Sequence, residues 1–221
     1  MKLTSFRPTP FLILLLLLSG CSLHGNPPDF TASGYLADRG SVRIWRKNDG
    51  KHISHMMTIF TPFNGGPSET TNYQWLGGKP IVIERHTSGK RPEDVTLRFA
   101  QDGKLSFMQR QLVGRREPLS DNQIALYLFD AERMVRISDD LLRGRVILLQ
   151  GQWLPTGIIR SCQGTEVRPE FDSSEQAYIT RALAATSGPL SIAWLEAPGG
   201  SQLLLVSTED LCKTEPTAKD F

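Results

Sequence analysis

The sequence has few of the features that usually identify an enzyme or a membrane-spanning protein. Its 221 residues include only three cysteines and four histidines. They contain no Gly-x-Ser-x-Gly elbow, no His-Glu-x-x-His helix and no phosphate-binding glycine loop. The longest apolar run, at 11–18, has eight residues, whereas a membrane-spanning helix needs roughly 20. These absences argue against a transmembrane anchor and common hydrolase chemistry, so we expect a protein that is not an enzyme and needs no cofactor.

The sequence also lacks a large excess of either sign of charge. The formal net charge is +2, and removal of residues 1–20, which contain Lys2 and Arg7, leaves 23 basic and 23 acidic residues. A neutral chain without a basic run has no electrostatic attraction for nucleic acid. We therefore expect no nucleic-acid partner.

What is present begins with a secretory signal. A positively charged start, the apolar run at 11–18 and two small residues are typical of such signals. The residues that follow resemble the bacterial lipobox, which ends in a cysteine that is acylated after cleavage. The motif consists of Leu18, Ser19, Gly20 and Cys21. Two or three acyl chains anchor a protein stably, and Ser22 is not the aspartate typical of inner-membrane retention. We therefore expect an outer-membrane lipoprotein that faces the periplasm.

The other two cysteines, Cys162 and Cys212, remain as a pair if Cys21 carries lipid. An oxidising compartment favours disulfides, so we expect a structural disulfide that holds the C-terminal hairpin to the strand containing Cys162. The alternative is a catalytic thiol at Cys162. It would leave Cys212 unpaired, and no histidine follows His86 in the sequence.

Hydrophobic patterning predicts an α+β fold: an antiparallel, twisted sheet or partial β-barrel with one or two packed helices. From residue 34 onward, short alternating segments are separated by turn residues, which is typical of a β-meander. The clearest hairpin has its turn at Asp102 and Gly103. Four apolar residues of this hairpin are expected on one buried face: Leu97, Phe99, Leu105 and Phe107.

Two helices are expected. Ser120 and Gln123 match a capping box at the start of the first, and Ser173 and Gln176 match one at the start of the second, which Gly188 would end. The apolar stripe of the first helix comprises Ile124, Leu128, Ala131 and Val135.

The composition of each segment suggests four parts. They are a lipoprotein signal peptide at 1–20, a tether at 21–33, a single β-rich domain at 34–215 and a flexible tail at 216–221.

Three histidines suggest a metal site, since imidazole binds zinc and, with nearby thioethers, copper. Residues three apart point to opposite faces of a regular strand, so His52 and His55 share an ion only if the segment is irregular. We therefore expect no metal site and keep His52, His55 and His86 as weak candidates.

Three further groups of side chains have a functional and a simpler interpretation. The carboxylates of Glu84, Glu93 and Asp94 suggest an acid–base pair of a glycan hydrolase, or ordinary surface residues. Aromatic residues suggest a ligand groove, or core packing: Trp45, Tyr73, Trp75 and Trp153. Basic residues suggest contact with anionic lipid, or a solvated face: Arg115, Arg116, Arg143 and Arg145. The simpler interpretation is favoured in each case.

Beyond the lipobox, the stretches at 33–47, 71–111 and 161–171 resemble a family of enterobacterial lipoproteins of the YjaH type. The resemblance covers nearly the whole chain. No activity or catalytic residue is assigned to the family, so the resemblance implies no function.

Anchor, tether and β scaffold together favour a non-catalytic lipoprotein that either binds an envelope protein, a glycan or another envelope component, or takes part in envelope assembly. The alternatives are a periplasmic lipoprotein that binds a small ligand or metal and, less favoured, an envelope hydrolase.

Overall fold

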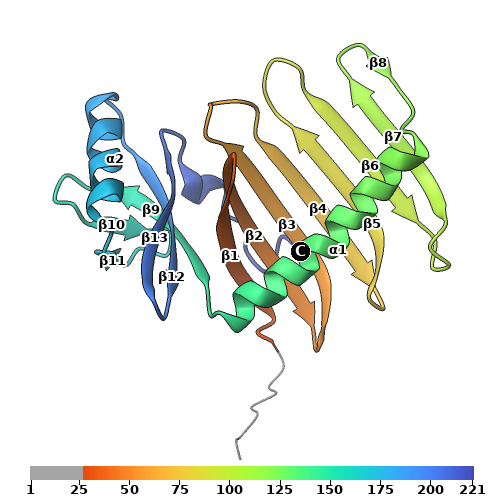
Figure 1. The fold of residues 1–221 in the computed structure, drawn as a ribbon, viewed down its shortest axis with the longest axis horizontal. Coiled ribbons are helices and arrows are strands. Elements are labelled where there is room, and N and C mark those ends of the chain that lie inside the picture. The colour runs from red at the N-terminus through yellow and green to blue at the C-terminus, as the bar shows by residue number, and fades with distance from the viewer. Residues whose placement is uncertain (1–26) are drawn as a thin grey trace, which may run out of the picture.

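A computed structural model describes residues 27–221. The expected signal peptide, the lipobox with Cys21 and the first part of the expected tether, residues 21–26, lie outside the described residues. The described chain forms two antiparallel sheets and two α-helices (Figure 1). Neither helix is both long and apolar enough to span a membrane.

The first sheet is a meander of eight strands in sequence order, each paired with its neighbours in the chain. Its strands are β1 (Phe30–Ala37), β2 (Gly40–Asp49), β3 (His52–Pro62), β4 (Glu69–Leu76), β5 (Lys79–Thr87), β6 (Glu93–Phe99), β7 (Leu105–Leu112) and β8 (Arg115–Arg116). Tight turns hold the meander together. Between β4 and β5, Gly77 and Gly78 both have positive φ, of 59° and 79°, which a two-residue hairpin turn requires and glycine adopts without strain.

The second sheet has five strands in the order β11-β10-β9-β12-β13. Its strands are β9 (Ile147–Trp153), β10 (Ile159–Ser161), β11 (Glu166–Val167), β12 (Ser191–Ala197) and β13 (Gly200–Ser207). It packs against the first strands of the meander, where Trp45 is buried with Ala193 and Leu195. β1 approaches so closely that a Cβ atom on Gly34 would lie 3.1 Å from Leu204 and only 2.6 Å from a backbone oxygen of β2.

Helix α1 (Asp121–Arg143) crosses the meander diagonally (Figure 1). Ser120 and Gln123 form the expected capping box at its start. The buried centre of α1 comprises Tyr127, Ala131, Met134 and Ser138, and the other expected stripe residues pack beside it, partly buried. Helix α2 (Ser173–Ala184) covers the second sheet, and a short 3-10 helix η1 (Leu211–Thr214) carries Cys212.

The expected fold class is confirmed, since the described chain has two helices packed on antiparallel sheets that do not close into a barrel. Two local expectations were wrong. The capping box of α2 is made by Asp172 and Glu175, one residue earlier than expected. In the 95–112 hairpin, the register shifts between Arg98 and Phe99, so Phe107 pairs with Arg98 and is 45% exposed. Leu105, also expected on the buried face, is 40% exposed.

The expected domain limits differ from the observed elements. β1 begins at Phe30, so the boundary at residue 34 falls inside a strand. At the other end, the ring of Phe221 lies 5.5 Å from that of Phe30. Lys47 Nζ also donates a hydrogen bond of 2.6 Å to the Phe221 carbonyl. The segment expected to be a tail therefore packs on the first strands of the domain.

Candidate functional site

A cavity of about 260 Å³ lies between α1 and the first five strands of the meander. Its floor comes from alternate residues of β1 to β5, because successive strand residues face opposite sides of a sheet. Its roof comes from one stripe of α1. The lining residues are Tyr35, Ala37, Val42, Thr58, Phe60, Glu69, Thr71, Tyr73, Arg85, Tyr127, Asp130, Arg133 and Met134.

Part of the cavity wall is aromatic and apolar. Tyr73 is buried and stacks on Trp75, with ring centroids 5.5 Å apart. Tyr35 donates a long hydrogen bond of 4.0 Å to the sulfur of Met134. With Phe60, these side chains offer a surface for an apolar group.

The charged residues of the wall form two loose pairs. Arg85 Nη1 lies 3.6 Å from a carboxylate oxygen of Glu69, and Arg133 Nη1 lies 3.8 Å from one of Asp130. Both distances exceed those of good charge-assisted hydrogen bonds, which are about 2.7–2.9 Å. The charges are therefore close, yet their hydrogen-bonding capacity is not used within the pairs.

Arg85 has a second contact that fixes its position. Its guanidinium lies over the ring of Tyr127, 4.8 Å from the centroid. Arg85 Nε is buried and has no hydrogen-bond partner among the described residues. A buried donor of this kind is uncommon in native structures. Arg85 is thus held at the cavity wall by an aromatic face and not by a full set of hydrogen bonds.

Burial raises the pKa of the three tyrosines of the cavity. The pKa of Tyr73 is raised to about 12, by burial first and by the Asp130 carboxylate second. Burial also raises the pKa of Tyr35 and of Tyr127, although Arg133 and Arg85 respectively oppose the effect. All three side chains therefore present neutral hydroxyls at physiological pH.

The cavity adjoins a smaller one of about 160 Å³ under the start of α1, and the two share Arg85, Tyr127 and Asp130. In the smaller one, Arg110 Nε donates a hydrogen bond of 2.9 Å to Glu93. Glu93 raises the pKa of Arg110 above its usual value. Arg110 therefore has a close carboxylate partner in Glu93, whereas Arg85 has no such close partner.

Larger hollows lie over loops at the surface. One of about 520 Å³ adjoins Trp153 and Phe171, and two of about 550 Å³ and 560 Å³ flank Lys90 and Arg91. Small-molecule sites are concave and combine apolar walls with a few converging polar groups. The cavity under α1 meets this description best.

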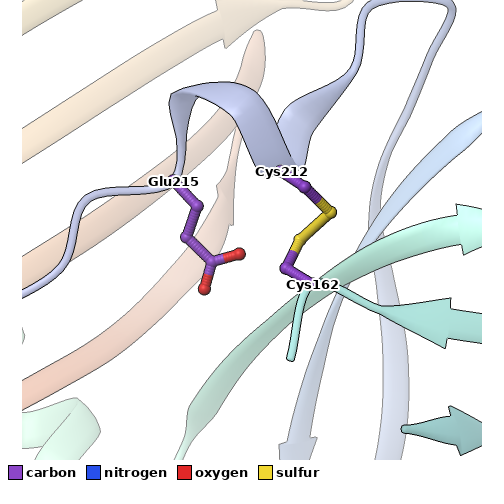
Figure 2. Close-up of side chains that lie close together, drawn as sticks. All are labelled: Cys162, Cys212 and Glu215. Atoms are coloured by element: carbon purple, nitrogen blue, oxygen red, sulfur yellow. A yellow bond between two sulfur atoms is a disulfide. The ribbon is translucent and has the colours of Figure 1, made fainter. Parts of the chain in front are cut away.

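The expected disulfide joins Cys162, which follows β10, to Cys212 in η1, with an S–S distance of 2.09 Å. Figure 2 shows the Glu215 carboxylate beside it. Glu215 accepts hydrogen bonds from Gln150 at 3.2 Å and Gln163 at 3.1 Å. Because both sulfurs are bonded to each other, Cys162 has no free thiol in this structure.

The three candidate histidines do not come together. Within residues 27–221, Cys162, Cys212 and Glu215 form the one group of three or more potential ligands close enough to hold a metal ion, and its sulfurs are in the disulfide. His86 instead hydrogen-bonds to Asp94 at 2.7 Å.

The segment of His52 and His55 is irregular, which is the exception that the strand-alternation argument allowed. The β2–β3 register shifts beside them, so that His55 pairs with Lys47 and His52 with Asp49. Lys47 and Asp49 are two apart in β2, and the two histidines therefore share a face. Burial, and then the charge of Lys47, lowers the pKa of His55.

The meander separates the three candidate carboxylates. Glu93 lies under α1 with Arg110, whereas Glu84 and Asp94 pair with Thr96 and His86 in the register of β5 and β6. Since Ile83 and Arg85 face α1, Glu84 faces away from it. The carboxylates do not share one cleft.

The aromatic candidates mostly pack in the interior, as the simpler interpretation held. Trp45 and Trp75 are 1% and 6% exposed, and Trp153 packs against the core beside α2. Tyr73 has both roles, because it is buried and lines the cavity. Arg115 and Arg143 have exposed side chains, each paired with a nearby carboxylate.

Sequence reasoning missed most of the cavity, including Tyr35, Glu69, Arg85 and Asp130. A signal was present in β5, where Arg85 continues the inward-facing series after Ile83. A charged residue at an inward position is an exception to the pattern, since such residues are seldom buried unless they are paired. The residues of α1 and of the other strands carry no comparable local motif.

Comparison with known proteins gives a family for the chain. Residues 32–217 match a family described as "Protein of unknown function (DUF1481)". The chain is also 41% identical over 220 residues to "Uncharacterized protein YjaH" of Escherichia coli (strain K12), which covers 99% of this chain and 95% of that protein. No solved structure matches it significantly. The resemblance seen in the sequence is thereby confirmed, and the chain belongs to the DUF1481 family.

Proposed function

We propose that this protein is a non-catalytic lipoprotein of the bacterial outer membrane that binds a small envelope component in the cavity under α1. The observation that carries the proposal is the cavity itself, with its three buried or half-buried tyrosines and two loosely paired arginines. Its walls contain no serine, cysteine, histidine or lysine. A Ser–His or Cys–His pair is therefore not offered by these lining residues, which do include the carboxylates of Glu69 and Asp130.

The location rests on two features. The residues at 18–21 resemble a lipobox and Ser22 follows it, which favours an acylated Cys21 in the outer membrane, facing the periplasm. The disulfide between Cys162 and Cys212 supports an oxidising compartment.

The binding role can be tested by filling the cavity. Ala37 ends β1 and lines the cavity, whereas Leu36 precedes it and is exposed. We expect small-molecule fractions of an envelope extract to raise the melting temperature of the wild type and of the Leu36→Trp control, but not of Ala37→Trp. The proposal fails if no fraction raises it, or if Ala37→Trp responds as the wild type does.

The anchor can be tested separately. Cys21→Ser should leave the protein unprocessed or soluble, because acyl chains on Cys21 are the strong membrane contact that the sequence offers. Fractionation of cell envelopes measures this, with Ser22→Ala as the matched control. Full retention of the Cys21→Ser variant in outer membranes would contradict the lipid anchor.

A further inference from the structure

We propose that the ligand of the cavity under α1 is a small zwitterion with an apolar body, of which an amino acid with an aromatic side chain is the simplest example. This inference rests on the proposed function and names the chemical class of its ligand.

The charge balance of the cavity points to a ligand with both signs of charge. Two guanidinium groups, of Arg85 and Arg133, and two carboxylates, of Glu69 and Asp130, line one small space. A ligand with a single charge would complement one set only, and these side chains are 29–49% exposed, so the other set would keep its contact with water. A zwitterion offers its carboxylate to the arginines and its ammonium group to the acids.

The charged residues also have hydrogen-bonding capacity to spare. The contacts within the two pairs, 3.6 Å and 3.8 Å, are too long for good hydrogen bonds. Arg85 is an excellent partner for a ligand carboxylate, since a guanidinium binds a carboxylate through two parallel N–H donors. The contact with the Tyr127 ring keeps the Arg85 guanidinium in position without using its N–H donors, which stay available to a ligand.

The remaining wall selects an apolar body of limited size. Phe60, Tyr73 and Met134 provide aromatic and thioether surface, and neutral tyrosine rings also attract an ammonium group through their faces. The volume of about 260 Å³ lies just below the range of about 300–1,000 Å³ usual for small-molecule sites. A single amino acid or a molecule of similar size fits this space, whereas a folded partner or a lipid does not.

The inference can be tested with three probes that share one ring. L-phenylalanine carries both charges, 3-phenylpropionate lacks the ammonium group, and phenethylamine lacks the carboxylate. Calorimetry on the full lipoprotein in nonionic detergent at neutral pH, corrected with protein-free micelles, should show binding of L-phenylalanine. We expect each singly charged probe to bind at least tenfold more weakly.

Charge-neutral variants should then separate the two ends of the ligand. Arg85→Gln should weaken L-phenylalanine and leave phenethylamine unchanged, whereas Glu69→Gln should weaken L-phenylalanine and leave 3-phenylpropionate unchanged. Retained binding of one probe shows that the cavity is still folded. Arg98→Gln and Glu84→Gln, on the opposite face of the meander, are matched controls that should bind all three probes as the wild type does.

Several results would overturn the inference. A singly charged probe that binds as tightly as L-phenylalanine would make the cavity a simple cation or anion site. Lack of binding of all three probes at millimolar concentration would exclude a zwitterion of this size. If an envelope fraction still stabilises the wild type but not Ala37→Trp, the cavity is a binding site for another class of ligand. If that response is missing too, the proposed function has failed with it.

Discussion

Two arginines of β2 are buried on opposite faces of this strand. One connects β2 to the second sheet and the other connects β2 to α1. Arg43 faces the second sheet and donates a hydrogen bond of 2.7 Å to Gln150. Arg46 faces α1, where it donates to Ser138 at 2.7 Å and contacts Asp139 at 2.5 Å. Burial lowers the pKa of Arg43 to about 10, so it stays charged at neutral pH. β2 is therefore the strand on which the helix and the second sheet are both positioned.

Arg46→Ala should destabilise the protein by about 3 kcal/mol. The substitution removes the buried guanidinium that binds α1, and Ser138 loses that hydrogen-bond donor. Urea unfolding of the variant measures this. Arg136→Ala removes an exposed arginine of α1 whose ion pair is 3.9 Å long, and its effect should stay within about 0.5 kcal/mol. Equal effects of the two substitutions would show that the buried Arg46 contact contributes no more to the free energy of unfolding than an exposed ion pair does.

Tyr73 gives the stability a specific dependence on alkaline pH. Burial raises its pKa from 10.0 to about 12 in the folded protein, so the folded state keeps a proton that the unfolded state loses. Stability from this group is therefore present below pH 10 and is lost as pH rises from about 10 to 12. Over this range, the free energy of unfolding should fall less steeply in Tyr73→Phe than in the wild type. Identical slopes would contradict the burial of the hydroxyl.

At the scale of elements, the start of α1 is the part that local sequence specifies best. Ser120 accepts a hydrogen bond from the backbone of Gln123, and Gln123 accepts one from the backbone of Ser120 at 2.9 Å. Ser120→Ala should cost about 1 kcal/mol and speed amide exchange in the first turn of α1. Asp172→Ala is the matched control in α2, where it should speed exchange without affecting α1. Unchanged exchange in α1 after Ser120→Ala would argue against the cap.

Elements with local signals were predictable from the sequence, and those defined by long-range contacts were not. Both helices, the meander and the terminal hairpin were predicted from capping residues, glycine turns and strand alternation. The register shifts were not visible, and they explain why Phe107 is exposed and why His52 and His55 share a face. The cavity was missed because its floor and roof come from segments that only the tertiary fold brings together. The disulfide was predictable by elimination, since two cysteines remained for pairing.

At the scale of the whole molecule, α1 and the second sheet lie on opposite faces of the first strands, and α2 covers the second sheet (Figure 1). The first strands are therefore buried on both sides, whereas β5 to β7 are covered by α1 on one face only. The floor of the cavity takes residues from these first strands and also from β4 and β5. The doubly covered strands therefore position one part of the site, and Arg85 lies on a strand that α1 alone covers.

The disulfide should stabilise the C-terminal segment rather than the terminal hairpin that the sequence suggested. β12 is held between β9 and β13 in the sheet, so it does not depend on the bridge. Residues 211–221 have no such ladder and are held by the disulfide, the Glu215 hydrogen bonds and the Phe221 contact. The bridge spans 50 residues, and the chain entropy of a loop this long favours a loss of roughly 2–4 kcal/mol when it is removed.

Replacement of both Cys162 and Cys212 by serine should therefore lower the free energy of unfolding by that amount and speed hydrogen exchange chiefly after residue 210. The backbone amides of β12 should stay protected, because their partners in β9 and β13 remain. Hydrogen exchange read by mass spectrometry distinguishes the two regions, and alkylation of the native wild type is the control for a closed bridge. Faster exchange in β12 than in the last eleven residues would show that the bridge holds the sheet itself, and a thiol alkylated in native protein would show that the bridge does not form.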